Sequence, residues 1–305
     1  MRFNYIVTVH NKQFLIYKVL AAIVQYTKIS SKIYVVLDGC SDDSEKMVDQ
    51  FIAEHEHADI KKIFTQDVHE ILSINSALQI ADQTGEGFNI LLQDDVILDE
   101  PDLEHKIIFI NKMLHGKIGM LSFRHGMNIE LDYLKKSIRE IEVRESCYGH
   151  GISKKPVLPG TVIERMVAVR SPECIPFSVI RKVGLMDETL APFTYDNHDY
   201  SIRCLKHGLR NYMTPIAYIS EIEWGGMRKR PNEYVHNIMD RNRKYIFEKH
   251  SDFVRELLNT HSFNKKYKID SFKSEHESKL IKEYKNRAFS VSLMGRVVRK
   301  ITGKP

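Results

Sequence analysis

Two adjacent carboxylates, Asp94 and Asp95, are the residues of this 305-residue chain whose position most clearly favours chemistry. They follow an apolar run, residues 88–92, which is too short for a typical helix and is therefore predicted to be a buried strand. In an open α/β sheet, ligands bind beyond the carboxyl ends of the strands. Carboxylates at such a strand end suit a divalent cation that is shared with the phosphates of a substrate. The alternative is a solvated acidic turn that leads to Pro101.

A third carboxylate is predicted to reach the same edge of the sheet. Asp38 follows residues 33–37, which have the same buried-strand character. Because the carboxyl ends of parallel strands share one edge, Asp38 must lie on the side of the Asp94–Asp95 pair. An Asp-Gly sequence after a strand is usually only a turn, but beside a cation it could accept hydrogen bonds from a ribose or a base. No Walker A loop and no G-x-G-x-x-G follow the first strand, which disfavours a P-loop NTPase and a dinucleotide oxidoreductase.

An alternation of strands and helices must position these side chains. Hydrophobic periodicity in the first 95 residues indicates βαβ units, and therefore an α/β fold with a mostly parallel sheet flanked by helices. The predicted strands are residues 5–9, 33–37, 60–65 and 88–93, and the helices between them are residues 14–24, 43–52 and 71–81.

The pattern is weaker after residue 100. Residues 124–158 are polar and broken by glycines, and they are predicted to be an irregular excursion with one helix over residues 130–142. Elsewhere the periodicity predicts helices at residues 103–114, 177–183, 195–206 and 233–249, and strands at residues 118–122, 161–169 and 212–219.

The C-terminal segment differs in composition from the rest. We expect one domain over residues 1–230 and a helical, basic extension over residues 231–305. Apolar residues recur at three- or four-residue steps over residues 280–301, and basic residues flank them. A helix of this kind could pack on the domain or lie on an anionic membrane surface.

Overall composition excludes few classes of protein. The 45 Lys and Arg residues against 40 Asp and Glu give a net charge of +5, which does not argue for a nucleic-acid partner. The four cysteines are widely scattered without metal-binding spacing, as in a reduced compartment. No signal-peptide pattern begins the chain, and no apolar run approaches the roughly 18 residues that span a bilayer. We therefore expect a cytoplasmic protein, with peripheral membrane contact left open.

Four ordered motifs resemble those of family 2 glycosyltransferases with a GT-A fold, over residues 3–225. Each motif alone occurs by chance, but the four follow one another in the order and spacing of the family. The resemblance implies transfer of a sugar from a nucleotide-sugar donor to a glycan or lipid-linked acceptor. The motifs are residues 8–11 (TVHN), 36–44 (VLDGCSDDS), 91–95 (LLQDD), and 184–188 (GLMDE) with 196–203 (DNHDYSIR).

The resemblance implies roles for the residues that would bind the donor. Carried over by position, Thr8, His10 and Asn11 line the nucleotide pocket, and Asp38 contacts the nucleobase or the ribose. Arg228 lies in a basic segment after the only tryptophan and two glycines. It could cover the donor diphosphate, or it could belong to an ordinary turn with a solvated basic face.

The resemblance also implies a cofactor, Mg²⁺ or Mn²⁺, that holds the diphosphate. Asp95 is expected to bind the metal, and Asp94 to reach the ribose or the metal site. The first acid of the family's motif is Gln93 in this chain. This departure removes one negative charge and could weaken metal binding.

Inverting transfer requires a general base that takes the proton of the acceptor hydroxyl. In the family this base lies at a helix start, but the matching residue here is Asn197, which cannot accept a proton. We expect Asp196 to be the base and Asp199 to be a supporting acid. Alternatively, Asp196 caps the helix and Asp199 pairs with Arg203.

Two other functions remain open from the sequence. A sugar-phosphate nucleotidyltransferase would use a similar sheet and metal, although the residues after the first strand are not a basic, Gly-rich loop. A non-catalytic nucleotide-sugar-binding protein is the alternative from another class, because Gln93 and Asn197 both depart from the family's pattern.

Overall fold

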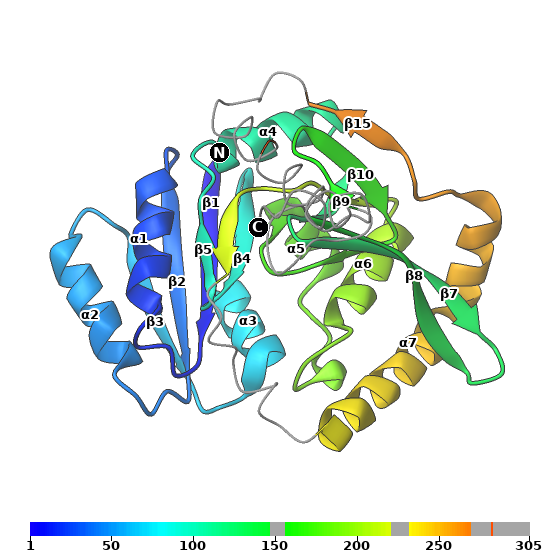
Figure 1. Ribbon diagram of the computed structural model, residues 1–305, viewed down its shortest axis with the longest axis horizontal. Helices are drawn as coiled ribbons and strands as arrows, with labels where there is room; N and C mark the ends of the chain where they lie inside the picture. Colours follow the sequence, from blue (N-terminus) through cyan, green and yellow to red (C-terminus); the bar gives the residue numbers. More distant parts are fainter. Residues whose placement is uncertain (147–155, 221–231, 270–281, 283–305) are drawn as a thin grey trace, which may run out of the picture.

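A nine-stranded sheet crosses the molecule, with helices on both faces (Figure 1). The computed structural model describes residues 1–146, 156–220, 232–269 and 282. From one edge to the other, the strands are β15 (Lys266–Lys268), β10 (Thr161–Arg165), β13 (Arg210–Met213), β6 (Ile118–Ser122), β12 (Glu173–Pro176), β4 (Gly87–Gln93), β1 (Arg2–Val9), β2 (Ser31–Asp38) and β3 (Ile60–Thr65).

Long parallel strands form the half of the sheet that the first 95 residues build. β4, β1, β2 and β3 are all parallel, as the strand–helix alternation predicted, and β13 is parallel to β6. β12 lies between β4 and β6 in the antiparallel direction, and β10 and β15 are antiparallel at the far edge. Because β12 runs against its neighbours, its first residue, Glu173, lies at the edge where β4 and β6 end.

Helices bury both faces of the central strands, which explains why these strands are apolar throughout. Tyr5 and Val7 of β1 point into one hydrophobic cluster, and Ile6 between them points into the other. The α/β fold expected from the sequence is therefore confirmed. The first cluster includes residues of α1 (Ile16–Tyr26), α2 (Ser44–Glu54) and α4 (Leu103–Met113), and the second includes residues of α3 (His69–Ile80), α5 (Phe177–Val183), α6 (Asp196–Lys206) and α7 (Asn232–Thr260).

The helix predicted over residues 130–142 is wrong, because these residues belong to an antiparallel hairpin. Met127 and Ile129 are buried two residues apart on one strand and Ile138 is buried on the other, and neighbouring charged residues conceal this period-two pattern. The strand predicted over residues 161–169 is two strands in different sheets. The hairpin strands β7 (His125–Asp132) and β8 (Ser137–Ser146) form a second sheet with β9 (Pro156–Val157) and β11 (Val167–Val169), and β5 (Val96–Leu98) pairs with β14 (Tyr218–Ser220).

The described part of the C-terminal segment packs on the same core. α7 continues past Lys249, where the predicted helix ended, to Thr260, and β15 extends the main sheet by pairing with β10. The predicted division into two domains at residue 230 is not tested by these contacts and stays a prediction. The apolar stripe at residues 280–301, and the membrane contact predicted from it, lie outside the described residues except for Lys282.

The described residues include three of the four cysteines. Cys40, Cys174 and Cys204 are free thiols, as the scattered cysteine pattern predicted, and Cys147 lies outside the described residues. Within the described residues, no helix combines the length and the apolar character needed to cross a membrane.

A buried ion cluster joins α6 to α7 around Asp199, whose side chain is inaccessible to solvent. Its carboxylate accepts a hydrogen bond from Arg203 Nε at 2.6 Å and lies 2.8 Å from both Lys249 Nζ and His250 Nε2. Burial alone would raise the pKa of Asp199, but the His250 hydrogen bond and the Arg203 charge outweigh it and hold the pKa far below its usual range. The cluster therefore fixes α7 against the first turns of α6.

Asp199→Asn is expected to lower the free energy of unfolding at pH 7 by about 3 kcal/mol, because the basic groups lose their buried counter-charge. The folded pKa of Asp199 is depressed, so its contribution is complete above the unfolded value of about 3.9 and decreases below it. Urea unfolding should show that the difference from wild type narrows between pH 5 and pH 3. The exposed Asp252→Asn is the matched control, and equal stability of D199N and wild type at pH 7 would contradict this role.

Candidate active site

A cavity of about 530 Å³ lies at the carboxyl ends of the parallel strands. It receives side chains from the ends of β1, β2 and β4, from the turn after β6, from the segment before β12, and from the first turns of α3 and α6. Asp38 and the Asp94–Asp95 pair lie at the same edge of the sheet, as the sequence predicted, because β1, β2 and β4 are parallel. The predicted residues that line the cavity are Thr8, His10, Asp38, Asp94, Asp95 and Asp196.

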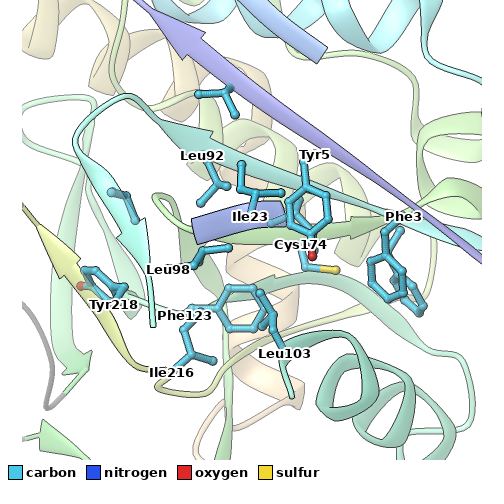
Figure 2. Close-up of a cluster of buried hydrophobic side chains, with 14 of the residues drawn as sticks. Phe3, Tyr5, Ile23, Leu92, Leu98, Leu103, Phe123, Cys174, Ile216 and Tyr218 are labelled. Carbon is cyan, nitrogen blue, oxygen red and sulfur yellow. The ribbon is translucent and has the colours of Figure 1, made fainter. Parts of the chain in front are cut away.

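The Asp94–Asp95 turn connects β4 to β5 and is held from beneath by apolar contacts. Leu92 before the turn and Leu98 after it belong to one buried cluster (Figure 2). Tyr218 of β14, which is paired with Leu98, closes the same cluster. Because both flanks are buried, the backbone of the turn is fixed while its two carboxylates face the cavity.

Burial makes ionisation of these two carboxylates costly. It raises the pKa of Asp94 to about 7, although the charge of Lys12 and the His10 backbone N–H oppose the shift. The N–H donates to Asp94 Oδ2 at 2.8 Å, and Lys12 Nζ lies 3.9 Å from Oδ1. Burial also raises the pKa of Asp95. A cation bound at the turn would offset this cost, so the residues fit a divalent metal whose other ligands come from a substrate.

Gln93 belongs to a hydrogen-bonded network and is not placed as a metal ligand. Its side-chain N–H donates to Glu70 Oε1 at 2.6 Å, and its backbone N–H donates to Ser171 Oγ at 2.9 Å. A carboxylate at position 93 would repel Glu70 and could not donate this hydrogen bond. The departure from the family's acidic motif therefore has a local cause, the carboxylate of Glu70.

Arg170 is the centre of this network and is almost inaccessible to solvent. Its Nε donates to Glu70 Oε1 at 2.9 Å, and its Nη1 forms a short ion pair with Asp196 Oδ2. Nη1 also donates to Asn197 Oδ1 at 3.2 Å, and it lies 3.9 Å from Glu173. One guanidinium thus joins α3 to the first turn of α6.

Asn197 also makes hydrogen bonds that use both groups of its side-chain amide. Its side-chain N–H donates to Glu173 Oε2 at 2.7 Å while its oxygen accepts from Arg170. An aspartate here could not donate to Glu173, a buried group whose pKa burial raises to about 8. Asn197 therefore links Glu173 to Arg170 through hydrogen bonds.

The helix start that contains Asp196 provides two other features of the cavity wall. Among the described residues, Asp196 Oδ1 has no hydrogen-bond partner, because the ion pair uses only Oδ2. His198 also lines the cavity, and its Nε2 lies 3.3 Å from Glu140 Oε1. Asp199 does not line the cavity and lies in the ion cluster described above. The sequence expectation that Asp199 is a catalytic acid is therefore not supported by its position.

The other end of the cavity is built around Asp38. Its carboxylate accepts hydrogen bonds from Thr65 Oγ1 and from the backbone N–H groups of Val68 and His69, at 2.7 to 2.8 Å. Asn11 lies outside the cavity lining, where its Oδ1 accepts the Ser41 backbone N–H at 2.7 Å and joins two loops. Asn11 thus supports the site rather than facing a ligand.

Within the described residues, one group of three side chains has the spacing of a metal site: His10, Asp38 and Asp67 have ligand atoms within 4.8 Å of one another. Both Asp38 oxygens are already hydrogen-bonded, and His10 Nδ1 is engaged with the Asp38 carbonyl oxygen at 2.7 Å. We therefore place the candidate cation at the Asp94–Asp95 turn instead.

Several charged residues of the cavity carried no signal in the sequence. They are isolated in the chain and reach the cavity only through the tertiary fold. Arg228 lies outside the described residues. The charged residues that sequence reasoning missed are Lys12, Glu70, Arg124, Glu140 and Arg170.

Comparison with known proteins finds similarity only at the level of structure. No family model matches the chain, and no curated protein matches it in sequence. TarS of S. aureus is 14% identical over 97% of this chain and 45% of its own length, with a TM-score of 0.53, so the chain spans less than half of TarS. GalNAc-T7 with UDP, GalNAc and Mn²⁺ is 12% identical over 98% of this chain and 58% of its own, with a TM-score of 0.61.

A third similar structure is the mannosyltransferase PcManGT of Pyrobaculum calidifontis with GDP-Man and Mn²⁺. It is 10% identical over 99% of this chain and 84% of its own length, with a TM-score of 0.51. These likenesses show that the chain has the GT-A glycosyltransferase fold, as its ordered motifs predicted.

Arg170→Met is expected to lower the free energy of unfolding at pH 7 by about 3 to 5 kcal/mol, because Glu70 and Asp196 would be left without their counter-charge. In the variant the carboxylates bind protons more tightly when folded than when unfolded, so its deficit should shrink from pH 7 to pH 5. Urea unfolding at both pH values measures this. Arg139→Met, an exposed arginine on the hairpin, is the control, and a deficit that is equal at both pH values would refute the assigned network.

Proposed function

We propose that this protein is a metal-dependent glycosyltransferase that transfers a sugar from a nucleoside-diphosphate donor to a hydroxyl group of a glycan or lipid-linked acceptor. The observation that carries the proposal is the Asp94–Asp95 turn, two cavity-facing carboxylates whose ionisation burial disfavours. The GT-A fold supports it. So do the nucleotides and Mn²⁺ named for GalNAc-T7 and PcManGT.

The charge balance of the cavity supports a cation as cofactor. Among the described residues, six carboxylates line the cavity against three Lys and Arg side chains. A cation held by one or two carboxylates together with substrate phosphates is the usual arrangement for Mg²⁺. The carboxylates are Asp38, Glu70, Asp94, Asp95, Glu140 and Asp196, and the basic residues are Lys12, Arg124 and Arg170.

The donor would bind across the strand ends. Thr8, His10 and Asp38 would contact the nucleoside, and Asp95 with Asp94 would hold Mn²⁺ or Mg²⁺. When bound, the metal would offset the negative charge of the leaving diphosphate. The fixed turn between β4 and β5 would keep the carboxylates in place, so no reorganisation would be needed during transfer.

We further propose that Asp196 is the general base and that transfer inverts the anomeric configuration. Among the described residues, no group donates a hydrogen bond to its Oδ1, whereas the Arg170 ion pair holds Oδ2 and orients the carboxylate. Asp196 would take the acceptor proton as the hydroxyl oxygen attacks the anomeric carbon. Asp199 is not proposed for this step, because basic side chains surround it outside the cavity.

Asp95→Ala is expected to reduce sugar transfer by about 10²- to 10³-fold or more, because the leaving diphosphate loses its stabilising cation. The melting temperature should be unchanged, since the carboxylate faces the cavity and is not packed in the hydrophobic core. Transfer and slow donor hydrolysis are measured with Mn²⁺ and with EDTA, and Asp102→Ala, an exposed ion-pair residue, is the control. Wild-type turnover in EDTA would exclude the metal site.

Asp196→Asn is expected to reduce turnover at saturating donor by about 10²- to 10⁴-fold, the range for loss of a general base. Donor affinity should remain near the wild-type value. Proton NMR of the product should show the opposite anomer from that of the donor, and Asp199→Asn should keep its turnover at a temperature where it is folded. Retention of configuration would exclude Asp196 as the inverting base.

A further inference from the structure

We propose that Arg124 binds the diphosphate of the donor and stabilises it as the leaving group. The inference rests on the proposed function and assigns a residue to it. Arg124 lies in the turn that follows β6, and its side chain lines the cavity. Arg124 lies outside the four ordered motifs of the sequence.

The charge of Arg124 is available for a ligand, unlike that of the other arginine in the cavity. Arg170 is committed to Glu70 and Asp196. Among the described residues, the Arg124 guanidinium has no ion pair and no hydrogen bond to an acceptor, and the residue is only partly buried. An unpaired guanidinium in a cavity suits a phosphate group, to which it can donate two parallel hydrogen bonds.

The neighbours of Arg124 place its charge beside the Asp94–Asp95 turn. Burial raises the pKa of Asp95, and the positive charges of Lys12 and Arg124 act against that shift. The same Arg124 charge acts on Glu70. His125 adds no positive charge at neutral pH, because burial and the Arg124 charge lower its pKa to about 4. Arg124 is therefore the cationic neighbour of the turn on the β6 side.

The order of the strands places Arg124 on the far side of the Asp94–Asp95 turn from the residues proposed to contact the nucleoside. Asp38 and His10 lie at the ends of β2 and β1, the Asp94–Asp95 turn lies at the end of β4, and Arg124 follows β6 beyond β12. Neighbouring strands are about 4.8 Å apart, so the ends of β4 and β6 are separated by roughly 10 Å. A nucleoside over β1 and β2 would direct its phosphates past β4 toward Arg124.

The backbone of Arg124 is fixed from three directions before any ligand binds. Phe123 is fully buried in the cluster shown in Figure 2, and its N–H donates to the Pro172 carbonyl oxygen at 3.0 Å. Ser122 Oγ accepts the backbone N–H of Arg124 at 3.1 Å, and the Ser146 N–H donates to the Arg124 carbonyl oxygen at 2.7 Å. A fixed backbone lowers the entropy cost of placing the guanidinium on a ligand.

Binding of UDP, GDP, UMP and GMP by calorimetry, with Mn²⁺ present, tests the assignment. Arg124→Met is expected to weaken binding of the diphosphate that wild type prefers by at least tenfold, but to change binding of the matching monophosphate by less than twofold. Arg124→Lys keeps the charge and loses the paired hydrogen bonds, so its affinity should be intermediate. Arg139→Met should bind as wild type does, and melting temperatures verify that each variant is folded.

Two results would overturn the proposal, and they differ in what they imply for the proposed function. If R124M and R124K bind the diphosphate within twofold of wild type, Arg124 is not a diphosphate ligand, although the transferase proposal stands. If wild type itself binds neither UDP nor GDP with Mn²⁺, the proposed function fails for these donors and the role of Arg124 fails with it.

Discussion

One buried guanidinium, that of Arg170, constrains the whole site. It forms ion pairs with Glu70 on α3 and with Asp196 at the start of α6. One positive charge therefore holds together the two helices that would lie beside the donor and the acceptor. Removing either partner would leave a charge buried without compensation, at a cost of several kcal/mol. The position of Asp196, the candidate base, is therefore set by Arg170, which lies in the segment before β12.

The same constraint explains why this chain departs at two places from the glycosyltransferase motifs that its sequence resembles. Gln93 donates to Glu70, and Asn197 donates to Glu173 while it accepts from Arg170. An acidic side chain at position 93 would be repelled by Glu70, and one at position 197 would lack the N–H group that Asn197 donates to Glu173. The two departures that made a non-catalytic protein plausible from the sequence are thus adaptations to one network, and they leave the Asp94–Asp95 turn intact.

The sequence predicted the parts of the site that depend on local order. Asp38, Asp94 and Asp95 follow strands in a strand–helix alternation, so their common edge followed from the parallel sheet alone. It could not predict Arg170 or Arg124, because each is an isolated basic residue brought in by long-range packing. The helix expected over residues 130–142 was also wrong, because charged residues conceal the two-residue spacing of the buried Met127 and Ile129 on β7 and the burial of Ile138 on β8. Asp199 shows the converse, because this acid lies within a motif but its carboxylate is paired with Lys249 and His250 of α7.

The central claim, a cation-dependent nucleoside-diphosphate site at the Asp94–Asp95 turn, is tested most directly by thermal unfolding with ADP, CDP, GDP and UDP, each with Mn²⁺ or with EDTA. A ligand that binds only the folded state at 100 times its Kd stabilises it by about 2.7 kcal/mol. We predict that at least one diphosphate raises the melting temperature with Mn²⁺ and that no diphosphate raises it with EDTA. No shift with any diphosphate, or an equal shift in EDTA, would contradict the account.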